Sequence, residues 1–288
     1  TAIALIGAFK ARYGISVENI SAMAADTLER LKTERRMGTM VADVFSTTPA
    51  IVLEGKRQGL TVSLADLPAL QERDVWSVDI NAVDAEKHIP GYVLLIYVSW
   101  VNTKMVSPGA EPRSLKDLLL PQWSGGKIIG TDPTTHVGMY NFFIPYIDRG
   151  ILDWQYIETL GKQNLRLTTS ADKGALMLAQ GEAPFLLSGP VNIVNPMAKE
   201  GAPIKPVSLS EGTAVQMNLL SVIKGAPHPN AAKLFVNWLL TKEGQEVVGK
   251  LLGIPSVRKD VADHTAAQVR FTATTMLVTS AKEYDMVR

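Results

Sequence analysis

The hydrophobic pattern between residues 228 and 255 predicts two consecutive helices. Proline suits the first helical turn because its φ is fixed and its missing N–H would have no partner there, so we expect Pro229 to begin a helix that His228 caps. Thr241 then opens a second helix, which Gly253 and Pro255 end. Apolar residues of the first helix recur at three- and four-residue spacings and form one buried stripe: Ala232, Phe235, Val236, Leu239 and Leu240.

A histidine between two prolines invites a second interpretation, as a metal ligand or a proton carrier. No other His, Asp or Glu accompanies His228 at metal-ligand spacing. We therefore interpret His228 as part of the helix start.

Elsewhere, short apolar runs alternate with helical patterns, which is typical of an α/β architecture. We expect a strand at 14–20, a helix within 21–38 and a strand that runs into a polar turn at 42–50. The pattern continues through 92–104, 112–143, 165–190 and 212–224.

Composition restricts the chemistry. The 288 residues are 46% hydrophobic, which suits one large or two modest globular domains. The net charge is +1 and no block of Lys or Arg stands out, so we expect no nucleic-acid partner. The absence of cysteine excludes disulfides, thiol nucleophiles and Cys-based metal sites, and we expect neither a cofactor nor a metal.

The apolar runs are short compared with a membrane-spanning segment. The longest apolar run, Tyr92–Trp100, has about half of the roughly 20 residues that a membrane-spanning helix needs. The chain begins directly inside an amphipathic helical pattern with no strand or cap before it. We therefore expect that residue 1 is not the natural start.

Polar loops follow the predicted strands: "FSTTPA" at 45–50, "GTDPTTHVG" at 130–138, "LTTSADKG" at 167–174 and "LSGPVN" at 187–192. Such loops gather ligands in α/β sheets, although each one alone is also explained by helix capping. The sequence contains no GxSxG, HExxH, P-loop or GxGxxG motif, and its four histidines are scattered. Nothing here points to an enzyme.

Several stretches together resemble the extracellular solute-binding proteins of bacterial ABC transporters. They include "LKTERRMGTMVADVF", "WVNTKMV", "PRSLKDLLLPQWSGGKIIGTDP", "AQGEAPF", "GAPHPNAAKLFVNWLLTKEGQE" and "GIPSVRKDV". The resemblance covers about residues 9–263 and is greatest to the type 2 periplasmic binding proteins, which include ferric-iron and polyamine receptors.

The resemblance implies an α/β, two-lobed fold with two crossing hinge strands, near 99–102 and 216–221. Lobe one would comprise 1–99 and 220–288, and lobe two 100–219, with solute held in the cleft between them. Family members begin with a strand that this chain lacks. We would then expect a periplasmic monomer that performs no catalysis, captures a small-molecule solute by hinge closure and delivers it to an ABC permease in the inner membrane.

The family's iron receptors hold their metal with adjacent tyrosines in the loop after the GE turn. Here that loop reads "GEAPFLLSGPVNIVNP", with no tyrosine, so ferric iron is disfavoured. Polyamine receptors need clustered carboxylates and aromatic rings, to which Asp132, Glu211 and Trp100 could contribute. The hydroxyl-rich loops and helix N-termini favour a small organic anion. Iron and polyamine receptors remain alternatives, as does the ligand-sensing domain of a sensor or regulator.

The candidate ligand-binding residues come from five loops. In lobe one they are Ser21, Met23, Ser46, Thr47 and Thr48, and in lobe two they are Thr134, Thr135, His136, Ser188, Asn192 and Glu211. Each also has a purely structural interpretation. His136 could be a buried, hydrogen-bonded residue at a helix start, and Glu211 could be a solvated turn residue. For Trp100, core packing is favoured over a stacking role.

Overall fold

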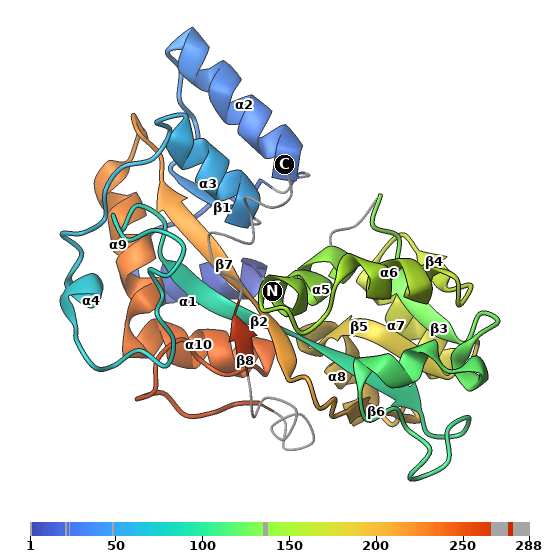
Figure 1. The fold of residues 1–288 in the computed structure, drawn as a ribbon. Helices are drawn as coiled ribbons and strands as arrows, with labels where there is room; N and C mark the ends of the chain where they lie inside the picture. The colour runs from blue at the N-terminus through green and yellow to red at the C-terminus, as the bar shows by residue number, and fades with distance from the viewer. Residues whose placement is uncertain are drawn as a thin grey trace. The chain divides into compact units, whose positions relative to one another are not determined.

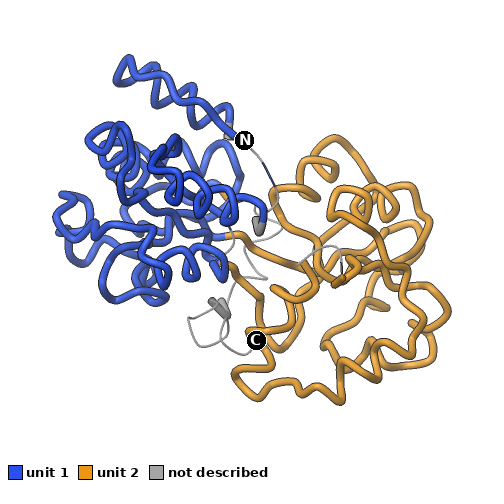
Figure 2. The backbone as a smooth tube through the Cα atoms, turned by 90° about the horizontal axis from the view of Figure 1, so that it is seen from above, with its two compact units in different colours: residues 1–94, 217–264, 280–288 blue, residues 95–216, 265–279 orange. Residues whose placement is uncertain are grey.

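The computed structural model describes residues 2–20, 22, 24–47, 49–134, 138–265 and 276–278, which form a mixed α/β protein (Figure 1). The chain divides into two compact units (Figure 2). Unit 1 comprises Thr1–Leu94, Met217–His264 and Ser280–Arg288, and unit 2 comprises Leu95–Gln216 and Thr265–Thr279.

Two long strands connect the units. β2 (Gly91–Asn102) and β7 (Thr213–Val222) each begin in one unit and end in the other. Within these two strands the chain changes unit after Leu94 and after Gln216. Both strands are almost wholly buried, which explains why they read as continuous apolar runs.

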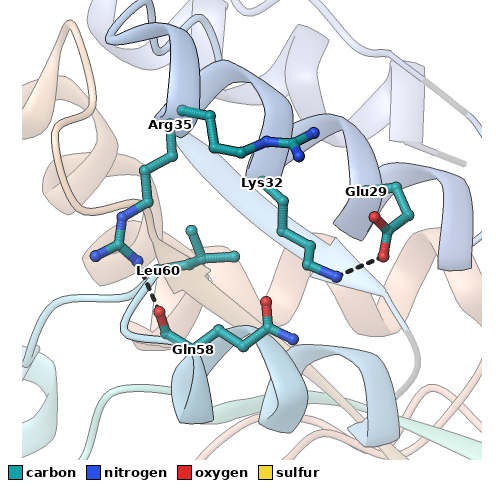
Figure 3. Close-up of a pocket in the computed structure, with 6 residues that line it drawn as sticks. Glu29, Lys32, Arg35, Gln58 and Leu60 are labelled. Carbon is teal, nitrogen blue, oxygen red and sulfur yellow. Dashed lines mark hydrogen bonds and ion pairs between the residues drawn. The ribbon is translucent and has the colours of Figure 1, made fainter.

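Unit 1 places helices around a short antiparallel pairing of β1 (Val44–Thr47) with the second half of β7, in the register Phe45 opposite Ser221. A pocket of about 310 Å³ lies between α2 and the segment after α3 (Figure 3). The helices of this unit are α1 (Ala2–Tyr13), α2 (Ala24–Met37), α3 (Pro49–Arg57), α4 (Pro68–Gln71), α9 (Pro229–Leu240) and α10 (Lys242–Leu252).

The two predicted helices near the C-terminal end are confirmed as α9 and α10. His228 is the N-cap of α9 and Pro229 its first residue, although the imidazole makes no capping bond. The Thr241 hydroxyl accepts from the Gly244 N–H and so caps α10, and Gly253 ends α10 in the left-handed conformation at φ 62°.

The strand predicted at 14–20 is wrong, because these residues form neither strand nor helix. Ile15 and Val17 are half-buried while their neighbours are exposed, so the alternation in the sequence is real. Alternation reports burial on one side of an extended segment, and no described strand pairs with this one.

Unit 2 contains a mixed sheet. The second half of β2 pairs antiparallel with β5 (Phe185–Pro190) and β6 (Ile204–Val207), while β3 (Ile128–Thr131) lies parallel to both β5 and β4 (Arg166–Thr168). The first half of β7 pairs parallel with β8 (Met276–Val278). The helices are η1 (Leu115–Leu119), η2 (Pro121–Trp123), α5 (Gly138–Asp148), α6 (Trp154–Gly161), α7 (Ala171–Gln180) and α8 (Val191–Lys199).

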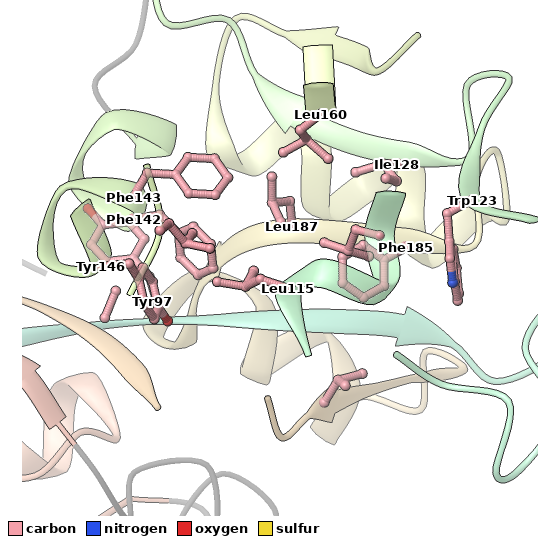
Figure 4. Packing of buried hydrophobic residues seen from close by; sticks show 14 of the residues in the cluster. Tyr97, Leu115, Trp123, Ile128, Phe142, Phe143, Tyr146, Leu160, Phe185 and Leu187 are labelled. Carbon is pink, nitrogen blue, oxygen red and sulfur yellow. The ribbon is translucent and has the colours of Figure 1, made fainter. Parts of the chain in front are cut away.

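The core of unit 2 follows the alternation of β5. Phe185 and Leu187 join an aromatic cluster with Phe142 and Tyr146 of α5 (Figure 4). Leu186, between them in sequence, faces α7, where a Cβ on Gly174 would lie 3.2 Å from its Cδ1. Both faces of β5 are therefore covered, and only its C-terminal end is available to position polar groups.

Within the described part of the chain, no helix combines the length and the apolar character needed to cross a membrane.

Candidate functional site

The C-terminal end of β5 turns directly into α8, and we call Ser188–Asn192 the β5–α8 corner. Pro190 is the N-cap of α8 and makes no side-chain capping bond. The first N–H groups of a helix have no partner within the helix and carry partial positive charge. The corner therefore combines a helix start with the polar side chains of Ser188 and Asn192.

Two side-chain atoms in this corner are buried without a hydrogen-bond partner among the described residues. They are Oγ of Ser188, whose residue is 3% exposed, and Oδ1 of Asn192. Buried polar atoms are nearly always satisfied, so unsatisfied ones call for an explanation. A bound solute that supplies the missing partners is one explanation.

A close backbone contact holds the corner in place. The indole Nε1–H of Trp100 donates to the carbonyl oxygen of Gly189 at 3.0 Å. A Cβ at Gly189 would lie 2.5 Å from Cδ1 of Trp100, so the position accepts only glycine without rearrangement. Trp100 is 0% exposed, which agrees with the predicted role in packing.

A buried polar network lies beside the corner, since Tyr97 of β2 pairs with Pro190 in the sheet register. The Tyr97 hydroxyl donates to Oε1 of Gln216 at 3.3 Å, and the Asn141 side-chain amide donates to the same oxygen. Burial raises the pKa of Tyr97, so its hydroxyl stays protonated. The sequence prediction missed this network, although a Gln inside an apolar strand and an Asn inside the aromatic run "MYNFF" were detectable signals.

In unit 1, Ser46 and Thr47 lie at the end of β1. The Ser46 hydroxyl donates to the Leu219 carbonyl at 3.1 Å and lies 3.1 Å from the Tyr92 hydroxyl. The Ser46 hydroxyl proton therefore already makes a hydrogen bond within the sheet, and the Tyr92 hydroxyl is the second polar contact of Ser46. Thr47 is half-buried.

Thr134 is exposed in the loop after β3. Both its hydroxyl and its backbone N–H donate to Oδ1 of Asp132, at 2.7 and 2.9 Å. These two bonds hold the pKa of the Asp132 carboxyl below its usual value. In this turn Thr134 can accept a hydrogen bond from a solute, but its hydroxyl proton is engaged.

Glu211 has a structural role that the sequence did not suggest. Its Oε1 accepts from the N–H of Leu115 at 2.9 Å, at the start of η1, and its Oε2 accepts from the Ser210 hydroxyl at 3.1 Å. The carboxylate thus ties the turn before β7 to η1. The remaining predicted ligand residues lie outside the described residues: Ser21, Met23, Thr48, Thr135 and His136.

Among the residues with described positions, no group of three or more His, Cys, Asp or Glu side chains could hold a metal ion. His228 contacts a single carboxylate, with Nδ1 3.1 Å from Oδ2 of Asp43. Asp43 Oδ1 also accepts from the His228 backbone N–H at 2.7 Å. Asp43 therefore supplies a hydrogen bond at the start of α9.

The sequence matches the family described as bacterial extracellular solute-binding protein over residues 4–274. An uncharacterized protein of Haemophilus influenzae is 32% identical over 173 residues, which are 55% of this chain and 48% of that protein. The matched segment spans about half the length of this relative.

Solved structures share the fold. The periplasmic binding protein AfuA from Actinobacillus pleuropneumoniae, with fructose-6-phosphate bound, is 21% identical with a TM-score of 0.76 over 98% of this chain and 89% of that one. The ferric binding protein from Campylobacter jejuni is 17% identical with a TM-score of 0.79 over 99% of this chain and 92% of that one.

Proposed function

The chain belongs to the bacterial extracellular solute-binding protein family, and we propose that it is the periplasmic receptor of an ABC importer that captures a small hydroxylated organic anion. The predicted α/β periplasmic-binding-protein fold is confirmed. Membership of the family supports a role in binding, and delivery to a permease is part of the proposal.

The observation that carries the site assignment is the pair of unsatisfied buried atoms in the β5–α8 corner. The Ser188 hydroxyl can donate to an anionic oxygen, which the start of α8 also favours through its N–H groups and dipole. Oδ1 of Asn192 is an acceptor and needs a donor, such as a hydroxyl group. An anion that also carries a hydroxyl group satisfies both atoms.

Thr47, Thr134 and Glu211 remain in the proposal with smaller roles. The Glu211 carboxylate is committed to Leu115, and Thr134 can only accept while its turn is intact. The fructose-6-phosphate recorded for AfuA is a hydroxylated anion, which supports testing that class first. The alternative solutes are polyamines and ferric iron, the metal of the Campylobacter ferric binding protein.

Native mass spectrometry of protein purified without refolding would identify a retained solute. Calorimetric titration should then compare hydroxy acids, sugar phosphates, plain carboxylates, spermidine and ferric citrate. We expect binding of hydroxylated anions, weakened about tenfold or more by Ser188→Ala, because a hydrogen bond to a charged group contributes roughly 1.5–3 kcal/mol. Asn192→Ala should weaken it by a smaller factor, because its bond to a neutral hydroxyl group contributes roughly 0.5–1.5 kcal/mol.

Ser99→Ala is the matched control, since the Ser99 hydroxyl is equally buried but donates to the Leu187 carbonyl at 2.6 Å. We expect it to change stability more than affinity. Tight binding of spermidine or ferric citrate with no response to anions would contradict the anion assignment and leave the receptor proposal standing. Anion binding that survives both corner substitutions unchanged would contradict the site.

A further inference from the structure

The pocket in unit 1 is rich in positive charge. Its lining residues come from α2 and from the segment after α3: Glu29, Lys32, Arg35, Arg36, Gln58 and Leu60 (Figure 3). Three of these six carry a positive charge and one a negative charge. All of them lie in unit 1, whereas the β5–α8 corner lies in unit 2.

The charges in this pocket do not balance. Nζ of Lys32 is 2.6 Å from Oε1 of Glu29, so these two side chains neutralise each other. Arg35 and Arg36 have no carboxylate within 4.0 Å among the residues that the structure describes. Among the residues with described positions, the pocket therefore presents two guanidinium groups that have no carboxylate partner.

The neighbouring cations differ in this respect. Arg30, on the same helix, pairs with Glu34 at 2.7 Å. Lys56, on α3, pairs with the buried carboxylate of Asp84. The excess charge is thus concentrated where α2 faces the end of α3.

Arg35 is held in position before any ligand arrives. Its Nη1 donates to the Gln58 carbonyl at 2.6 Å, as Figure 3 shows, and a Cβ on Gly59 would lie 3.7 Å from the same nitrogen. Gly59 has φ +67°, a conformation that favours glycine. Because the guanidinium is already anchored, less side-chain entropy is lost when its other N–H groups bind a ligand.

We propose that the α2–α3 pocket binds a phosphate group. Two guanidinium groups offer paired N–H donors that match phosphate oxygens, and their charge balances a phosphate dianion. The pocket volume of about 310 Å³ accepts a small phosphorylated molecule, and its open side would also admit the headgroup of an anionic phospholipid. None of its lining residues belongs to the proposed solute site, and the inference does not depend on the proposed function.

The test is titration of the full chain with inorganic pyrophosphate at low and high salt, and flotation with vesicles of phosphatidylcholine alone or with phosphatidic acid. We expect pyrophosphate binding that weakens with salt and falls about tenfold or more in Arg36→Gln. Arg36 is exposed and its side chain donates to Thr33 within α2, so this variant should fold. Lys10→Gln, an exposed cation on α1 outside the pocket, is the control.

Each outcome decides the proposal. Pyrophosphate binding lost in Arg36→Gln supports a soluble phosphate ligand, and vesicle binding lost in that variant, without pyrophosphate binding, supports a lipid headgroup. The proposal would be overturned if neither pyrophosphate at millimolar concentration nor the vesicles bound. It would also be overturned if binding persisted in both Arg36→Gln and Arg35→Gln. Pyrophosphate binding that is lost in Ser188→Ala but kept in Arg36→Gln would assign the anion to the β5–α8 corner instead.

Discussion

The indole N–H of Trp100 donates to the carbonyl oxygen of Gly189, and the same ring occupies the space that a Cβ at Gly189 would need. We expect Gly189→Ala to lower the free energy of unfolding by about 1–3 kcal/mol, because the ring cannot move without disturbing a packed core. Urea denaturation measures this change.

A double-mutant cycle tests the cause of that loss. Trp100→Phe removes the larger ring, so Gly189→Ala should cost less in the Trp100→Phe background than in the natural chain. Strictly additive costs would show that the strain at Gly189 arises elsewhere.

Ser188→Ala and Ser99→Ala should differ in their effects on stability. The Ser188 hydroxyl is buried without a partner, so its removal should leave the free energy of unfolding unchanged or raise it by up to about 1 kcal/mol. The Ser99 hydroxyl makes a 2.6 Å bond, so its removal should lower that free energy by about 1 kcal/mol. Thermal and urea unfolding without added solute measure both changes. If the Ser188 hydroxyl had a hydrogen-bond partner, the two variants would show equal losses in the free energy of unfolding.

Stability should depend on pH through Asp84. Burial alone would raise the pKa of its carboxyl, but the bond and charge of Lys56 and the N–H of His88 together hold that pKa below the usual value. A carboxyl group whose pKa is lower in the folded state than in the unfolded state stabilises the fold. This stabilisation is complete above the unfolded-state pKa of about 3.9 and is lost as the pH falls through the folded-state pKa.

The difference between the natural chain and Asp84→Asn isolates this contribution. Their unfolding free energies should differ most near neutral pH and converge as the pH falls below about 4. Glu182→Gln, which changes an exposed carboxylate in a turn, should show a smaller difference. A gap between Asp84→Asn and the natural chain that stays constant down to about pH 2 would contradict the assignment.

His228→Asn should preserve the fold and the solute affinity. The imidazole is 72% exposed, so its ion pair with Asp43 is worth little, and the bond from the His228 backbone to Asp43 remains. We expect a change within about 0.5 kcal/mol, against a loss of about 1 kcal/mol for Asp43→Ala, which removes the hydrogen bond at the start of α9. Calorimetric melting and solute titration check both, and a large loss of affinity in His228→Asn alone would reinstate a ligand role.

Local patterns predicted the helix pair 229–252 well because its signals act within a few residues: a proline at the start, a threonine cap and a left-handed glycine. The alternation at Ile15 and Val17 failed as a strand signal because pairing depends on a neighbour that the segment itself does not specify.

The candidate site was less predictable, and for a related reason. Nothing near Glu211 in sequence shows that its carboxylate reaches Leu115, and nothing near Gln216 shows that it meets Asn141. The hydroxyl group makes Thr134 a candidate from its residue type, but the bond of that hydroxyl to Asp132 depends on the geometry of one turn. Residue type suggested the loops, whereas hydrogen-bond partners decide which atoms in them are available.

The division of unit 1 between two separated stretches of chain affects how the protein is made. Phe45 and Ser221 are opposite one another in the sheet but 176 residues apart in sequence. During synthesis, residues 1–94 leave the ribosome long before Met217–His264 exist, while Leu95–Gln216 emerges as one continuous stretch. Strand β1 therefore stays without its partner β7 until Met217–His264 has been synthesised, and for that interval the early part of the chain is exposed to chaperones and proteases.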